Sequence, residues 1–367
     1  MNSARPSLDQ TQSGFDALRA SIGNRFSRYN FDQADPTTAG WRLGQRGAID
    51  VQFSPKFKLG PQDAIFTMGS CFARNVEESL IREGIRVLLK DFDFPQQLLH
   101  PLHKSLQAGL NGPDHARWLR TVLNKYTTHS MLNEFERILT PERFRDPFRG
   151  LIKIDDARWF DPQINNLRNT SLDEALIARD VVENAAALVT QATAIFLTLG
   201  FTETWYDAET KALINAAPPP TLIRRFPERF RFFNATHAQT VQCLEELYEL
   251  LTAKIRNDMK FVVTVSPVPL GATFTTNDVI VANAYSKATL RSAAGEFASR
   301  HDNVDYFPSY EMIALAHPDI TWEEDWVHVR QPLIDTVIRR FVKGYIEDAR
   351  DGSAMSSDIR VDAAVDP

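Results

Sequence analysis

The chain has 367 residues, of which 43% are hydrophobic and 24% are charged, which is typical of a globular α/β protein with a sizeable core. It carries 41 basic and 47 acidic residues, and the net charge of -6 argues against nucleic acid or an anionic membrane as a partner. Two cysteines exclude a disulfide framework and a cysteine-based zinc motif, and no apolar run resembles a signal peptide or a membrane span, so we expect a soluble, cytoplasmic protein.

The first elements along the chain form a βαβ pattern. Residues 1–60 mix proline, glycine, arginine and aspartate without sustained periodicity, which predicts an extended N-terminal arm. The apolar run 64–68 predicts a buried strand, and the helix after it has apolar residues at helical spacing and ends at Gly84. Residues 85–89, with the sequence IRVLL, predict a second strand.

A helical insertion interrupts this alternation from residue 91 to about 170, inside an α/β domain that we place at 61–350. The later elements predicted, in chain order, are helix 172–193, strand 194–199, helix 239–257, strand 261–266, helix 279–300, strand 304–307 and helix 332–349. Strands with near-continuous Val, Ile and Leu favour a five-stranded, doubly wound parallel sheet of flavodoxin-like type. The tail 351–367 is rich in Asp, Ser and Ala and is predicted to be disordered.

Ser70 follows the first predicted strand, and ligands of open parallel sheets bind beyond the carboxyl ends of the strands. A hydroxyl at a sharp strand-to-helix turn would be exposed beside the amides of the first helical turn, which suits a nucleophile with part of an oxyanion hole. The alternative is that Ser70 only caps the helix. Cys71 is a second candidate nucleophile, because a helix N-terminus lowers the pKa of a thiol. The GxSxG elbow of α/β-hydrolases is absent.

A serine nucleophile needs a base, and of the eight histidines only His328 has an aspartate, Asp325, three residues before it. The loop that leads into the last helix can place this imidazole over the end of the first strand, with Asp325 holding the other ring nitrogen. The alternative is a surface turn whose aspartate caps the helix.

The sequence GFTE follows the strand 194–199. Gly200 permits close approach of the backbone, the Thr202 hydroxyl can donate to a developing oxyanion, and Glu203 is suited to orient its neighbours. A solvated turn is the alternative interpretation.

Several further residues have two interpretations each. The aromatic side chains Trp205 and Trp326 can line a sugar-binding cleft or belong to the core. Tyr126 and Thr127, in the insertion, are equally ambiguous: they can bind substrate or belong to the core. The basic run 224–231 can meet an anionic substrate or face solvent.

The sequence GSCFA at 69–73 is the signature of the GSCFA family, which this chain resembles. The blocks TLGFTETW, VSPVPL, YFPSYE and DWVHV follow in that family's order, and the resemblance extends from about residue 55 to 345. The family in turn resembles the SGNH, or GDSL-type, hydrolases, whose flavodoxin-like core carries a serine in the first block and DxxH in the last.

The resemblance implies roles for particular residues. Ser70 would be the nucleophile and part of the oxyanion hole through its backbone amide, His328 the general base and acid, and Asp325 its orienting partner. The GxND block of SGNH enzymes stands here as residues 200–203, so Thr202 takes the place of the asparagine that donates to the oxyanion. The sequence KYTTHS at 125–130 is a candidate for the corner that the second block supplies.

These observations predict hydrolysis of an acyl ester, on a small molecule or a glycan, by a Ser-His-Asp mechanism without a metal or cofactor. One alternative is acyl transfer to a glycan hydroxyl by the same residues. Another is a catalytically silent module that binds a carbohydrate or nucleotide at the same edge of the sheet.

Overall fold

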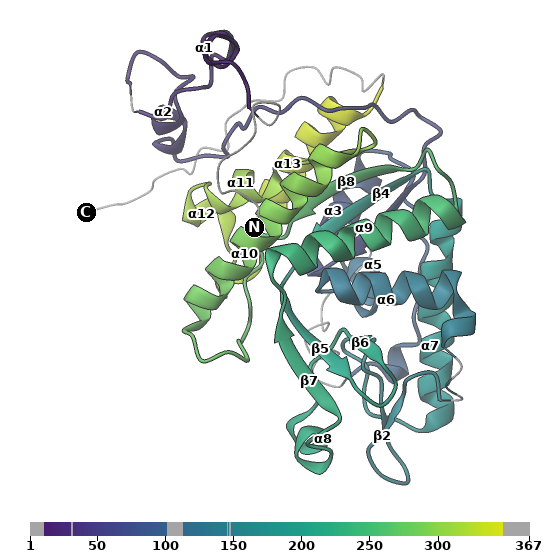
Figure 1. Ribbon diagram of the computed structural model, residues 1–367. Helices are drawn as coiled ribbons and strands as arrows, with labels where there is room; N and C mark the ends of the chain where they lie inside the picture. The colour runs from purple at the N-terminus through teal and green to yellow at the C-terminus, as the bar shows by residue number, and fades with distance from the viewer. Residues whose placement is uncertain (1–10, 31, 101–112, 145, 147, 348–367) are drawn as a thin grey trace.

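A parallel β-sheet lies at the centre of the computed structural model, which describes residues 11–30, 32–100, 113–144, 146 and 148–347 (Figure 1). Its four strands have the order β1-β4-β8-β9, where β1 is Ile65–Gly69, β4 is Ala194–Leu199, β8 is Lys260–Val265 and β9 is Val304–Tyr306. Every residue of β1 and β4 is buried, as the apolar runs predict for a sheet covered on both faces. The α/β class with a parallel sheet is therefore confirmed.

The prediction of a fifth full strand over 85–89 is wrong. In this segment only Val87 forms a bridge to β1, at Ile65. The chain then turns, with the Lys90 amide bonded to the Val87 carbonyl at 3.3 Å, and Leu89 packs into the core. A short apolar run predicts burial, and a buried turn satisfies that pattern as well as a strand does.

Helices cover both faces of the sheet. On one face lie α3 (Cys71–Arg82), α11 (Ser309–Ala314), α12 (Pro318–Thr321) and α13 (Gln331–Tyr345), and on the other lie α6 (Thr128–Leu139), α7 (Leu172–Ala187), α9 (His237–Lys254) and α10 (Val279–Arg300). Side chains along a strand alternate between the two apolar layers, as Phe196 and Leu197 of β4 do. The predicted helix 279–300 coincides with α10. Helix α3 ends at Arg82, and Gly84, two residues later, has a φ of 77° that allows the chain to reverse there.

The insertion between α3 and α7 contains more than helices. Its elements are the 3₁₀ turns η2 (Gln96–Leu98), η3 (Arg120–Leu123) and η4 (Pro141–Arg143), the helices α5 (Pro113–Leu119) and α6, and the antiparallel pair β2 (Ile152–Lys153) and β3 (Trp159–Phe160). The predicted helical insertion is not continuous: it is broken at 124–127, where Thr127 and Ser130 form a capping box that starts α6. Residues 101–112 of the predicted insertion lie outside the described residues.

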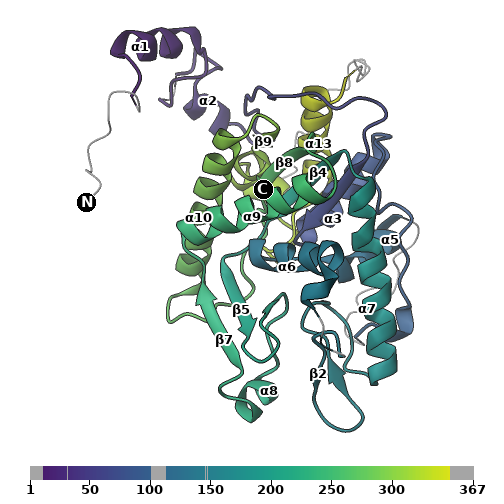
Figure 2. The ribbon, with the colours of Figure 1, turned by 45° about the vertical axis from the view of Figure 1, so that its right-hand side comes forward.

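A second, antiparallel sheet follows β4 and was not predicted. Its strands have the order β6-β5-β7, with β5 at Glu203–Asp207, β6 at Ala212–Ile214 and β7 at Phe230–Asn234, and α8 (Pro220–Arg225) lies between β6 and β7. Figure 2 shows this sheet on the same side of the main sheet as β2. The basic run 224–231 belongs to this unit, and its Arg229 pairs with Asp207 at 2.7 Å and Glu209 at 2.9 Å.

The N-terminal segment contains α1 (Gly14–Gly23), which has no buried residue, the short helix α2 (Ala39–Leu43), and a bridge from Leu59 to Ile346. The predicted disordered tail 351–367 lies outside the described residues. Within the part of the chain that the structure describes, no helix combines the length and apolar character needed to span a bilayer.

Candidate functional site

Ser70 lies at the junction between β1 and α3, but its hydroxyl is neither exposed nor a cap for the helix. The residue is 1% exposed, and its side chain forms no hydrogen bond to the first turn of α3. Instead the Ser70 Oγ donates to the Oγ of Ser266, the residue after β8, at 3.0 Å. The expectations of an exposed hydroxyl and of a side-chain cap are therefore both corrected.

Gly200 explains how Ser70 and Ser266 meet, although β4 lies between their strands. A Cβ at Gly200 would lie 3.4 Å from the Ser70 Cβ and 2.6 Å from the Tyr126 carbonyl oxygen. Because glycine leaves this space free, the two serine side chains can approach across the end of β4. We use the name Ser70 site for Ser70, Ser266 and Gly200.

The Gly200 amide is an unused donor in this site. No hydrogen bond from it is present among the described residues. The Ala194 amide bonds to the Ala64 carbonyl, so by alternation along β4 the Gly200 amide faces the side of β1, where the chain has already turned into α3. A buried N–H without an acceptor is uncommon, and one beside a serine hydroxyl is suited to hold a developing oxyanion.

Gly69, which precedes Ser70, is also required by close packing. Its φ is 156°, and a Cβ there would overlap both the hydroxyl and the carbonyl oxygen of Thr198 on β4. We expect Gly69→Ala to lower the free energy of unfolding by about 1 to 3 kcal/mol, measured by urea denaturation. Gly271→Ala is the control, because a Cβ there meets nothing within 4 Å. Equal stability of the two variants would contradict this account.

The segment 124–127 borders the Ser70 site. The Lys125 amide donates to the Gly69 carbonyl and the Phe201 amide to the Tyr126 carbonyl, both at 2.8 Å. The Tyr126 ring stacks on Phe201 at 5.9 Å, and desolvation raises the pKa of its phenol, which therefore stays protonated. Thr127 is buried as the cap of α6. The structure thus brings Tyr126 beside the Ser70 site and gives Thr127 a role in α6.

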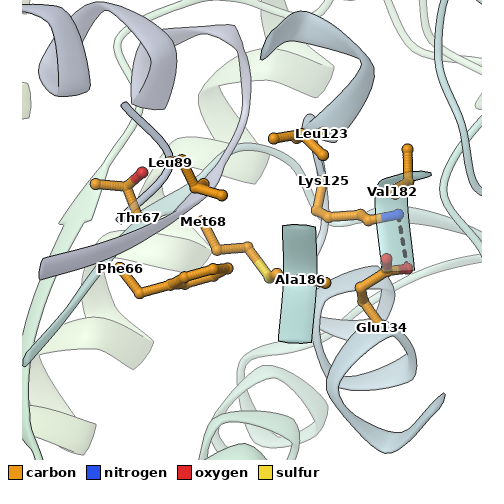
Figure 3. Close-up of a pocket in the computed structure, with 9 residues that line it drawn as sticks. All are labelled: Phe66, Thr67, Met68, Leu89, Leu123, Lys125, Glu134, Val182 and Ala186. Carbon is orange, nitrogen blue, oxygen red and sulfur yellow. Dashed lines mark ion pairs between the residues drawn. The ribbon is translucent and has the colours of Figure 1, made fainter. Parts of the chain in front are cut away.

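The Lys125 side chain extends away from this border to Glu134 of α6, at 2.9 Å (Figure 3). The cavity drawn there has a volume of about 10 Å³, room for roughly one water molecule, and is too small for a substrate. A larger cleft of about 440 Å³ is lined by Leu59, Glu83 and Val342 among others, and lies at the amino end of β1 rather than near Ser70.

Three other predicted residues have partners that the sequence did not suggest. The Thr202 hydroxyl donates to Asn234 Oδ1 at 2.6 Å, so its single hydrogen is already used. The Glu203 carboxylate accepts from the Thr273 hydroxyl and from the Phe274 amide. Trp205 packs against the rings of Phe232 and Phe274, with centroids 5.3 and 5.0 Å away.

Cys71 does not have the lowered pKa expected at a helix N-terminus. Desolvation raises the pKa of its thiol and outweighs the opposing effects of Lys287 and of the nearby backbone amides. A thiol that stays protonated is a poor nucleophile, so this correction favours Ser70 over Cys71.

Asp325 and His328 form a pair on an exposed turn. Their side chains are 48% and 57% exposed, and the His328 Nδ1 lies 2.6 Å from the Asp325 carboxylate. Desolvation opposes ionisation, but the hydrogen bonds from the His328 ring and from the amides of His328 and Val327 together outweigh it and lower the pKa of Asp325 to about 2. Asp325 caps its own turn rather than α13, whose cap position is Arg330.

The structure does not join this pair to the serine. Within the described residues no hydrogen bond links Ser70 to His328. The turn nevertheless lies on the α3 side of the sheet, because Trp322 and Val327 pack against the apolar cluster that Cys71 also contacts. Trp326, at 67% exposure, has a φ of 57° and projects from the turn instead of joining the core.

Two residues of this region were missed by the sequence interpretation. Ser266 lies in the block VSPVPL after β8, which was noted, but its hydroxyl was not singled out. Lys287 is a buried lysine of α10 that donates to the carbonyls of Gly200 and Val268. The helical spacing of α10 places Lys287 on the same buried face as Ser286 and Leu290, so its burial could have been predicted from the sequence.

These features define an α/β protein with a buried hydroxyl pair and an unused amide at the carboxyl edge of a parallel sheet. The model of the GSCFA family matches residues 64–341, and the chain belongs to this family. Comparison with curated proteins gives no match. Among the described residues, no group of three or more His, Cys, Asp or Glu side chains is placed to hold a metal ion.

Proposed function

We propose that this GSCFA protein is a serine hydrolase of acyl esters, with Ser70 as nucleophile. The observation that carries the proposal is the Gly200 amide, which has no acceptor within the described residues and belongs to a glycine whose Cβ position lies 3.4 Å from the Ser70 Cβ. At the carboxyl edge of the sheet, the hydroxyl can serve as the nucleophile of acyl transfer and the unused amide as the donor that holds the oxyanion. Val87 forms its bridge to β1 on the side away from β4. It therefore occupies the place that an outer strand takes beside β1 in a flavodoxin-like strand order, which supports the likeness to SGNH hydrolases.

In the proposed reaction, the Ser70 Oγ attacks the ester carbonyl carbon while its proton passes to the Nε2 of His328. The Gly200 amide holds the oxyanion, and His328 returns the proton to the leaving alcohol. Water then hydrolyses the acyl-enzyme, or a glycan hydroxyl accepts the acyl group in the transferase form of the reaction.

Asp325 supports the role of His328. It stays ionised and accepts from Nδ1, which leaves the Nε2 of the neutral ring as a proton acceptor. Because Ser70 donates to Ser266 and His328 is exposed, the proposal requires the turn 322–329 to close over Ser70 when an ester binds. The exposed Phe274, beside Trp205, offers an apolar surface next to this edge for an acyl or sugar group.

The test is labelling by a fluorophosphonate probe, together with hydrolysis of p-nitrophenyl acetate, in the wild type, Ser70→Ala and Cys71→Ala. We expect labelling and turnover to disappear in Ser70→Ala and to persist in Cys71→Ala, because the Ser70 hydroxyl is the proposed nucleophile and desolvation raises the pKa of the Cys71 thiol. Cys71→Ala is a matched control, since it changes the neighbouring residue by one atom. Labelling that survives in Ser70→Ala would overturn the assignment.

The 1% exposure of Ser70 argues against direct attack of its hydroxyl on an ester. This burial favours a second candidate function, a binding module that holds a carbohydrate or nucleotide without turnover. In that case a ligand would raise the thermal midpoint equally in the wild type and Ser70→Ala, and neither would hydrolyse esters. Turnover that depends on Ser70 would exclude this candidate.

A further inference from the structure

Lys287 is a buried cation without an acidic partner. The residue is 2% exposed, and within the described part of the chain it forms no ion pair. Other buried cations of the molecule do have carboxylate partners, namely Lys125 with Glu134, Arg120 with Glu77 and Arg179 with Asp161. A charge of this kind is costly to bury, so its retention needs a reason other than an ion pair.

The contacts of Lys287 lead to both neighbours of Ser70. Its Nζ donates to the Gly200 carbonyl at 2.9 Å and to the Val268 carbonyl at 2.6 Å. A Cβ at Gly200 would lie 3.4 Å from the Ser70 Cβ, so the two residues are close neighbours. The Val268 amide donates at 3.3 Å to the Ser266 Oγ that accepts from Ser70. One ammonium group therefore connects the segments that follow β4 and β8.

The Gly200 peptide is fixed from two directions. Its carbonyl accepts from Lys287, and the Phe201 amide of the same peptide plane donates to the Tyr126 carbonyl. The Lys287 Nζ also lies 4.8 Å from the centre of the Phe201 ring, a cation–π distance. Holding this peptide holds the orientation of Gly200, whose amide is the unused donor.

We propose that Lys287 is a positioning residue of the Ser70 site. It fixes the positions of the Gly200 amide and the Ser266 hydroxyl relative to the Ser70 hydroxyl. The inference deepens the proposed function and rests on it for the kinetic part of its test. Lys287 acts through Gly200 and Ser266 rather than on a substrate.

The protonation of Lys287 falls in an accessible pH range. Desolvation lowers its pKa to about 7, and Cys71 is the titratable group that acts on it in the opposite direction. The charged form, which makes the stronger hydrogen bonds to carbonyls, is present below that pH and is lost above it. The hold on Gly200 and Val268 should weaken accordingly as the pH rises through about 7.

The experiment compares the wild type with Lys287→Met, Lys287→Arg and the control Lys260→Met, a part-exposed lysine at the start of β8. We expect Lys287→Met to slow fluorophosphonate labelling of Ser70 by about tenfold or more, and to speed amide hydrogen exchange in peptides covering 199–203 and 265–269. Lys287→Arg restores most of the labelling rate, because a guanidinium also offers two donors. The ratio of wild-type to Lys287→Arg rates falls as the pH rises through about 7, since only the lysine loses its charge there.

Labelling and exchange that are unchanged in Lys287→Met would overturn the inference. If the wild type is not labelled at all, the proposed function fails, and local exchange alone decides the role of Lys287. If Lys287→Met does not fold, Lys287→Gln, which keeps a donor, replaces it in both measurements, with the same outcomes expected in smaller degree.

Discussion

Replacing His328 with alanine is expected to lower ester turnover by about 10² to 10⁴-fold, while the free energy of unfolding changes by less than about 1 kcal/mol. The loss of turnover follows from its role as the base that takes the Ser70 proton. The small effect on stability follows from its surroundings, because the side chain is 57% exposed and its ring bonds only to Asp325 among the described residues. Initial rates with p-nitrophenyl acetate and urea denaturation measure the two effects separately.

The control is His237→Ala, because His237 is another half-exposed histidine beside a carboxylate, 3.3 Å from Glu296. It should change neither turnover nor stability appreciably. Asp325→Asn should follow His328→Ala in turnover, since the amide cannot hold the imidazolium by charge. Wild-type turnover in His328→Ala would show that the exposed turn has no catalytic role, and the Ser70 proton would then have to leave through Ser266.

The strands of the main sheet were accessible to sequence reasoning because their signal is local. Ala194–Leu199 consists of residues that any parallel strand covered by helices would use, and the predicted range coincides with β4. Val304–Tyr306 was also predicted, one residue too long. The segment 85–89 has the same local composition, and only its tertiary surroundings decide that it turns after Val87.

The contacts of the candidate site were not accessible in the same way. The Ser70 hydroxyl and its acceptor Ser266 are 196 positions apart, and Lys287 lies 87 positions from Gly200. A motif identifies Ser70 as chemically interesting, but burial by Gly200, Ser266 and Tyr126 depends on how three segments meet. The pKa of Cys71 was mispredicted for the same reason. The helix N-terminus, which is visible in the sequence, was expected to lower it, but desolvation, which depends on the tertiary structure, raises it.

Sequence reasoning also gave no sign of the buried ion cluster that holds the insertion against α3. In this cluster Arg74 contacts Glu77 at 2.7 Å, and Arg120 contacts Glu77 at 3.0 Å and Glu78 at 3.1 Å. All four side chains are at most 5% exposed. Glu77 also accepts from the Thr67 hydroxyl of β1, so the cluster connects the strand before Ser70, the helix after it and the insertion.

Arg120→Met is therefore expected to lower the free energy of unfolding by about 3 to 5 kcal/mol. The variant keeps a long, unbranched side chain but leaves the carboxylates of Glu77 and Glu78 buried with fewer cationic partners. An uncompensated buried charge costs far more than a lost surface pair. Arg143→Met is the control, because Arg143 is 65% exposed in its pair with Glu136 and should cost less than about 1 kcal/mol.

Urea denaturation of the two variants, at equal protein concentration, measures both changes. The triple change Arg120→Met, Glu77→Gln and Glu78→Gln should recover part of the loss, because it removes the unpaired charges together with the arginine. If Arg120→Met costs no more than Arg143→Met, the cluster does not hold the insertion against α3. In that event segment 124–127 is held beside Ser70 by its other contacts, among them the backbone hydrogen bonds to Gly69 and Phe201 and the hydrogen bonds with Asn215.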